Sequence, residues 1–138
     1  MITAVDTNIL LDVLKPNLDF VHSSSKCLQY AAESGSIVIC DTVYTELCAH
    51  FLTQAECDLF LAENEFRVES LSRESSFLAS RVWRAYRLQG GPRTRVLADF
   101  IIGAHAQMQA SSLLTRDRGF FRKMFPALKV VDPSTFSN

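Results

Sequence analysis

Short apolar runs alternate along the chain with longer stretches of helical periodicity, and this alternation restricts the fold more than any other feature. Runs with the length of buried strands occur at 2–5, 37–40, 66–71, 113–115 and 130–131. Stretches with helical spacing lie between them, at 8–14, 18–34, from 41 or 42 to 51, from 53 onward, 74–89, 96–110 and 119–125. The pattern predicts an α/β fold of three layers, α/β/α, in which helices cover both faces of a mainly parallel sheet.

Local features predict how individual helices begin, end and pack. Gly35 follows the long helical stretch and is expected to end it in the left-handed conformation. Asp41 or Thr42 is expected to cap the following helix, which runs to residue 51. Thr53 is expected to begin the helix after that, with Ala55, Leu59 and Phe60 forming its apolar stripe.

Length and composition fit one domain that spans residues 1–138. Of these residues, 48% are hydrophobic and 21% are charged, which is typical of a globular protein and not of a disordered chain, a collagen or a coiled coil. We expect no secretory signal and no membrane span, since no apolar run reaches about 18 residues. The cysteines are spaced too irregularly for a zinc or redox pair, so we expect buried thiols and a reducing, cytoplasmic location: Cys27, Cys40, Cys48 and Cys57.

The formal net charge of −1 conceals a strong asymmetry along the chain. Residues 1–80 hold twelve acids and four bases, whereas residues 81–123 hold nine bases and two acids. Most of these bases are arginines, whose guanidinium groups bind phosphate through two hydrogen bonds. The block at 81–123 therefore fits a phosphate-rich partner, and a solvated basic face is the alternative.

Four acids fall near the carboxyl ends of predicted strands, where open parallel sheets place their sites. Asp6 directly follows the first strand, Glu46 lies in the helix after the second, and Asp117 lies two residues past the run at 113–115. Asp99 lies near the start of the helix at 96–110. Each acid alone has an ordinary explanation, as a turn or cap residue, a surface acid, or a favourable charge at a helix N-terminus.

If the four acids lie close together in the fold, repulsion between their carboxylates determines what the site can bind. Two carboxylates ~4–5 Å apart repel each other by about 3–4 kcal/mol at an effective dielectric constant of ~20. A divalent cation is the natural counter-charge, and an all-oxygen set of ligands suits Mg²⁺ or Mn²⁺. One or two such ions would lower the pKa of a bound water and stabilise an in-line phosphoryl displacement.

Other chemistries have less support in the sequence. The histidines are scattered, no G-x-S-x-G is present, and Gly90-Gly91-Pro92 is a helix breaker rather than a phosphate loop. Trp83 and Tyr86 lie among arginines and would either stack on bases or pack in the core.

The segments around the four acids resemble, in order, the four motifs of PIN-domain ribonucleases. They are residues 6–11 (DTNILL), 43–47 (VYTEL), 98–106 (ADFIIGAHA) and 113–120 (LLTRDRGF). The order, spacing and total length are similar to those of the compact VapC-type toxins of bacterial and archaeal toxin–antitoxin pairs. The resemblance covers nearly the whole chain.

This resemblance implies an RNA-cleaving endoribonuclease that uses Mg²⁺, with Mn²⁺ as an alternative, and that forms a homodimer and binds a cognate antitoxin. The acids implied to bind metal and to carry catalysis are Asp6, Glu46, Asp99 and Asp117. Hydrogen bonds that orient these acids are expected from Thr7, Asn8 and Thr115. Within the basic block, the candidate RNA contacts are Arg93, Arg95, Arg116 and Arg118.

Alternatives remain at this point. A receiver domain would need an acid adjacent to Asp6 and a suitable lysine, and an aspartyl phosphatase would need an aspartate where Asn8 stands. A PIN-like RNA-processing nuclease that is not a toxin, or a non-catalytic RNA- or protein-binding module with vestigial acids, would share the same motifs. An apolar group is compatible with a dimer or antitoxin groove and equally with core packing: Phe51, Leu52, Phe60 and Leu61.

Overall fold

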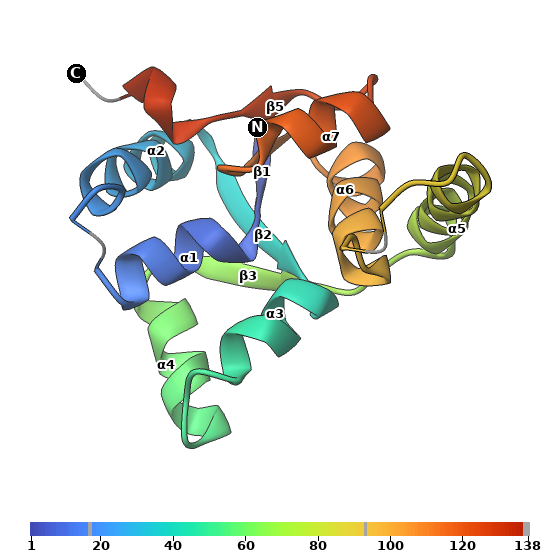
Figure 1. The fold of residues 1–138 in the computed structure, drawn as a ribbon. Coiled ribbons are helices and arrows are strands. Elements are labelled where there is room, and N and C mark those ends of the chain that lie inside the picture. Colours follow the sequence, from blue (N-terminus) through green and yellow to red (C-terminus); the bar gives the residue numbers. More distant parts are fainter. Residues whose placement is uncertain (17, 93, 137–138) are drawn as a thin grey trace.

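A central parallel sheet organises the protein. The computed structural model describes residues 1–16, 18–92 and 94–136 (Figure 1). In this part of the chain, five strands form one sheet in the order β3-β2-β1-β4-β5, and all of its pairings are parallel. The strands are β1 (Ile2–Val5), β2 (Ser36–Cys40), β3 (Phe66–Glu69), β4 (Ser112–Leu114) and β5 (Val130–Val131). The prediction of an α/β class with a mainly parallel sheet is confirmed.

Helices cover both faces of this sheet. They are α1 (Thr7–Leu14), α2 (Val21–Ser34), α3 (Asp41–Cys48), α4 (Gln54–Glu63), α5 (Arg73–Leu88), α6 (Leu97–Gln109) and α7 (Arg118–Met124), followed by the 3-10 turn η1 (Pro133–Phe136). Helix α2 packs against β2, whereas α6 packs against β1 and β4 and carries α5 on its outer side. Figure 1 shows α2 on one side of the sheet and the α5–α6 pair on the other.

The strand order places the first strand at the middle of the sheet, and this position creates the site. The chain runs outward from β1 to β2 and β3, and then returns to the other side of β1 for β4 and β5. The crossover direction therefore reverses between β1 and β4, which is where parallel α/β sheets bind ligands. The pairing ends with Val5 beside Leu114. It continues past the strands, because the Asp6 amide donates to the Leu114 carbonyl at 3.0 Å.

The core beneath this edge is aromatic and tightly packed. Phe100, Phe121 and Phe125 are almost completely buried. Gly103 of α6 leaves room for the Phe125 ring, because a Cβ atom at this position would lie 2.3 Å from that ring. The small residue one turn after Asp99 therefore admits an aromatic side chain.

Some local predictions were wrong where tertiary packing overrides local pattern. Gly35 has φ +156° and ψ −146°, outside the left-handed helical region. Glycine is needed there because a Cβ would lie 1.9 Å from the Met1 carbonyl oxygen. In α4 the Thr53 cap is confirmed, since its hydroxyl accepts a bond from the Glu56 amide. The apolar stripe is wrong, because Ala55 and Leu59 are exposed and the helix buries its two residues Cys57 and Leu61.

The N-terminus of α3 also differs from the expectation. Neither residue 41 nor residue 42 caps this helix, because Asp41 is its first helical residue and Cys40 occupies the cap position. Within the described residues, no helix combines the length and the hydropathy that crossing a lipid bilayer requires.

Candidate functional site

Asp6 is the most enclosed acid of the candidate site. It follows β1 and caps α1, where its Oδ1 accepts a 2.7 Å hydrogen bond from the Thr7 amide. Its Oδ2 accepts from the Thr115 hydroxyl at 2.7 Å and from the Asn8 side-chain amide at 3.3 Å. Burial raises the pKa of Asp6 to about 6, and the charge of Glu46 adds to this rise, although the hydrogen bonds from Thr115 and Thr7 oppose it.

Thr115 and Asn8 connect Asp6 to the loop after β4. The Thr115 hydroxyl, which donates to Asp6, accepts a bond from the Asp117 amide at 3.0 Å. The Asn8 carbonyl oxygen accepts from the Arg116 amide at 3.3 Å, and its amide nitrogen lies 3.5 Å from the Thr115 hydroxyl. These two residues therefore connect the Asp6 carboxylate to the backbone that carries Asp117.

Glu46 faces Asp6 from α3. Its side chain is exposed, and its Oε1 accepts a 2.7 Å hydrogen bond from the Thr7 hydroxyl. Thr7 therefore contacts both acids, since its backbone amide bonds Asp6 and its hydroxyl bonds Glu46. Because the charge of Glu46 raises the pKa of Asp6, these two carboxylates interact electrostatically across the site.

Asp99 lies in the first turn of α6. It is the third residue of α6, and its Oδ2 accepts from the Val96 amide at 3.4 Å, so it also stabilises the start of the helix. Burial raises the pKa of Asp99, and the Asp117 charge adds to the rise, whereas the Val96 bond and the Arg95 charge lower it. The functional and the helix-start explanations of this acid are therefore compatible.

Asp117 is engaged by an arginine of the same chain. Arg95 donates to Asp117 Oδ2 from Nη1 at 2.5 Å and to Oδ1 from Nη2 at 3.2 Å. The Arg95 guanidinium carbon also lies 4.3 Å from the centre of the Phe120 ring, in a cation–π contact. Hydrogen bonding to Asp117 raises the pKa of Arg95, which keeps the guanidinium group charged.

Electrostatic interactions connect the four acids in series. Glu46 and Asp99 both raise the pKa of Asp6, and Asp117 raises that of Asp99. An all-carboxylate set of donors with excess negative charge fits Mg²⁺ or Mn²⁺ by its chemistry.

The side chains of the four acids are not arranged as a set of metal ligands. Among the residues that the structure describes, no three His, Cys, Asp or Glu side chains are grouped so as to hold one. All four acids already accept hydrogen bonds within the chain, and Asp117 is also ion-paired with Arg95. An ion that used all four carboxylates would have to compete with these contacts, above all with the Arg95–Asp117 ion pair.

The predicted RNA contacts differ in how available they are. Arg93 lies outside the described residues. Arg95 is held by Asp117, and Arg116 donates to Asp12 through two nitrogen atoms. Arg118 is the most open of the described three, with 53% of its side chain exposed and an ion pair to Asp132 at 3.5 Å.

Asp12 is a residue of the site region that the sequence analysis missed. It is 97% inaccessible, and it binds both Arg116 and the Ser24 hydroxyl. A signal for it exists in the sequence, because Asp12 interrupts the apolar run 9–14 just as Asp99 interrupts its own apolar segment. A buried acid within an apolar helix requires a partner.

The remaining side chains of interest have structural contacts. Tyr86 and Trp83 are half-buried against the core, with the Tyr86 ring 5.3 Å from that of Phe100. His105 is buried and lies 2.8 Å from Glu69. The four cysteines are free thiols, of which only Cys48 is not fully buried. The apolar group at 51–61 is divided, since Leu61 is buried and Leu52 is fully open to solvent.

The fold and the site together define an α/β protein with an acidic site at the point where the strand order of a parallel sheet reverses. The PIN domain family model matches residues 3–125, and the chain belongs to this family. No curated protein sequence matches the chain.

Several solved structures share its fold. VapBC-1 from nontypeable Haemophilus influenzae is 20% identical with a TM-score of 0.74, over 97% of this chain and 99% of that one. VapBC2 from Rickettsia felis, solved with a promoter DNA fragment, is 20% identical with a TM-score of 0.73, over 96% and 98%. A toxin–antitoxin complex from Klebsiella pneumoniae is 20% identical with a TM-score of 0.67, over 95% and 97%.

Proposed function

We propose that the protein is a Mg²⁺- or Mn²⁺-dependent endoribonuclease and the toxin of a toxin–antitoxin pair. The observation that carries the proposal is a hydrogen-bonded series at the switch point of the sheet. It runs from Glu46 through Thr7 to Asp6, and from Asp6 through Thr115 to the Asp117 amide. Membership of the PIN domain family supports a nuclease. The VapBC neighbours and the toxin–antitoxin complex support the toxin assignment.

Asp6, Glu46, Asp99 and Asp117 would hold the ion. When bound, a divalent cation lowers the pKa of water and stabilises the charge of a phosphodiester undergoing in-line displacement. The chain's own contribution is orientation, because Thr7, Asn8 and Thr115 fix the Asp6 carboxylate through three hydrogen bonds. Burial also matters, since it raises the pKa of Asp6 and so disfavours a charged site that lacks a cation.

RNA would approach over the basic block. Arg95 and Arg118 flank Asp117. The Arg95–Asp117 pair is partly exposed to solvent, and Arg118 is itself 53% exposed, although its partner Asp132 is buried. Such partly screened ion pairs exchange readily for a phosphate group. Arg93 remains a candidate contact on its sequence position alone. We include a cognate antitoxin and a homodimer in the proposal, on the same comparison with the VapBC complexes.

The direct test is cleavage of a fluorescent single-stranded RNA by purified protein. We expect cleavage with Mg²⁺, none with a chelator, and a loss of at least 100-fold in Asp6→Asn and Asp99→Asn. The matched control is Asp58→Asn, which removes an exposed carboxylate of α4 that bonds only to side chains of α3 and α4. Cleavage that survives both asparagine substitutions at the site would refute the proposal.

The toxin role needs a separate experiment. Expression of the chain in bacteria should arrest growth, and co-expression of a small protein encoded beside it should relieve the arrest. Harmless expression of a chain that cleaves RNA in vitro would favour an RNA-processing nuclease. RNA binding that needs no metal, with no cleavage, would favour the non-catalytic module.

A further inference from the structure

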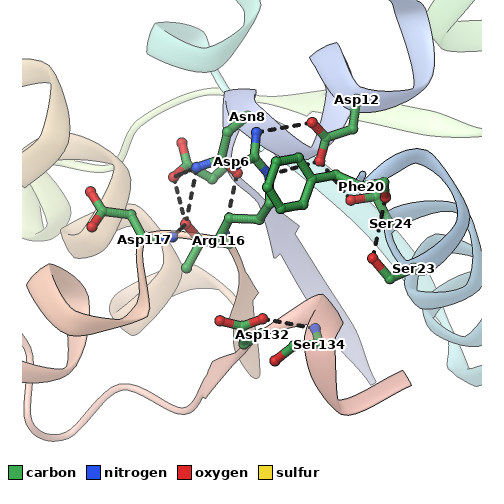
Figure 2. A network of polar contacts seen from close by, with 11 residues as sticks. Asp6, Asn8, Asp12, Phe20, Ser23, Ser24, Arg116, Asp117, Asp132 and Ser134 are labelled. Atoms are coloured by element: carbon green, nitrogen blue, oxygen red, sulfur yellow. Dashed lines mark hydrogen bonds and ion pairs between the residues drawn. The ribbon is translucent and has the colours of Figure 1, made fainter. Parts of the chain in front are cut away.

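A buried ion pair lies beside the candidate site and belongs to none of its four acids. Arg116 Nε donates to Asp12 Oδ2 at 2.8 Å, and Nη2 donates to Oδ1 at 2.9 Å. The Ser24 hydroxyl donates to the same Oδ2 at 2.7 Å. The Phe20 ring covers the guanidinium, whose central carbon lies 4.0 Å from the ring centre. Figure 2 shows this cluster directly beside Asp6 and Asn8.

The geometry of this pair indicates a fixed structural element. Asp12 is buried, and a buried carboxylate is tolerated only when it is paired and hydrogen-bonded. Here both of its oxygens are bonded, in the parallel two-bond arrangement that only arginine provides. The guanidinium is therefore strongly held, and its stacking on Phe20 restricts it further.

The backbone of Arg116 connects this pair to the site. Arg116 lies between Thr115, whose hydroxyl bonds Asp6, and Asp117. Its amide donates to Asn8, which in turn donates to Asp6. On the other side, Asp12 lies in the same helix, α1, as Asn8 and one and a half turns after the Asp6 cap. The ion pair thus joins the helix that carries one acid to the loop that carries another.

We propose that Asp12 and Arg116 are a positioning pair that sets the relative placement of Asp6 and Asp117, and thereby the affinity of the site for a divalent cation. The inference rests on the proposed function, because the ion is the one proposed there. It reassigns Arg116 from contact with RNA to organisation of the site. Ser24 and Phe20 keep the pair in place.

The test uses Arg116→Lys, which retains the positive charge but cannot form both bonds to Asp12. We expect the Mn²⁺ dissociation constant, measured by calorimetry, to rise about 10- to 100-fold, as is typical when a group that orients a metal ligand is lost. With Mn²⁺ limiting, kcat should fall while KM for RNA changes less than twofold. Asp12→Asn, which removes the negative charge and leaves one oxygen to accept from the arginine, should have the same effects. Arg122→Lys, at an exposed position of α7, is the matched control and should change nothing.

A second measurement needs neither metal nor RNA. Amide hydrogen exchange at residues 115–117 should accelerate about tenfold in Arg116→Lys, with β1 and β4 unchanged. If the wild type fails to bind Mn²⁺ or to cleave RNA, the proposed function fails, and the exchange data alone decide whether the pair orders the loop. The inference is overturned if Arg116→Lys folds with wild-type Mn²⁺ affinity and exchange, or if its defect is confined to KM, as expected for an RNA contact.

Discussion

Replacement of Arg95 by Gln should strengthen metal binding even though it removes a residue from the site. In the proposed function, Arg95 and the cation would compete for Asp117, so the energy of the ion pair would oppose binding of the metal. At ~4 Å and an effective dielectric constant of ~20, two unit charges attract each other by about 4 kcal/mol. The side chains of Arg95 and Asp117 are 32% and 35% exposed, and solvent reduces such pairs to about 1 kcal/mol. The two-bond geometry raises this toward 2 kcal/mol, so the Mn²⁺ affinity should increase about 5- to 30-fold.

Calorimetric titration of the metal-free protein with Mn²⁺ at pH 7.5 measures this effect. Arg122→Gln serves as the control, because it removes an equal charge from an exposed position of α7. The KM for RNA should rise in Arg95→Gln, because a candidate phosphate contact is lost while the metal binds more tightly. Unchanged or weaker Mn²⁺ binding in Arg95→Gln would refute the competition.

Three further predictions concern stability. Because folding raises the pKa of Asp6 from 3.8 to about 6, the free energy of unfolding of the metal-free protein should fall as the pH rises through this interval. Asp6→Asn should remove that loss, which amounts to up to about 3 kcal/mol at pH 7.5 and is measured by urea unfolding. Mg²⁺ at 100 times its dissociation constant should stabilise the fold by about 2.7 kcal/mol, seen as a rise in melting temperature that Asp99→Asn abolishes. Gly103→Ala should lower the melting temperature, because overpacking against Phe125 costs about 1–3 kcal/mol and outweighs the helix propensity of alanine; an unchanged value would contradict the packing argument.

The elements of the fold and the location of the site are accessible from sequence because local patterns determine them. The runs at 2–5 and 130–131 match β1 and β5 residue for residue. Asp6 and Asp117 follow strands of a parallel sheet, so their approach to one edge follows from the direction of the strands. The charges of Glu46 and Asp99 raise the pKa of Asp6, and the charge of Asp117 raises that of Asp99.

Partners of individual side chains were not accessible, because they depend on distances between segments far apart in the sequence. Arg95 and Arg116 are similar members of one basic block, yet Arg95 binds Asp117 and Arg116 binds Asp12. Nothing in the sequence around either arginine distinguishes the two outcomes. The buried face of α4 was mispredicted for a related reason. Contacts with two other elements, α3 and β3, determine which of its sides is buried.

The two arginine–aspartate pairs have opposite properties, and burial explains the difference. Asp12 is almost completely inaccessible, so separating it from Arg116 would leave an uncompensated buried charge and cost about 3–5 kcal/mol. Asp117 is partly exposed, so water can replace Arg95 at a cost of about 1 kcal/mol. The first pair therefore persists while the second exchanges. In the proposed function, a divalent ion at Asp117 or an RNA phosphate at Arg95 would therefore separate this pair without disturbing Arg116, whose backbone amide bonds Asn8 beside Asp117.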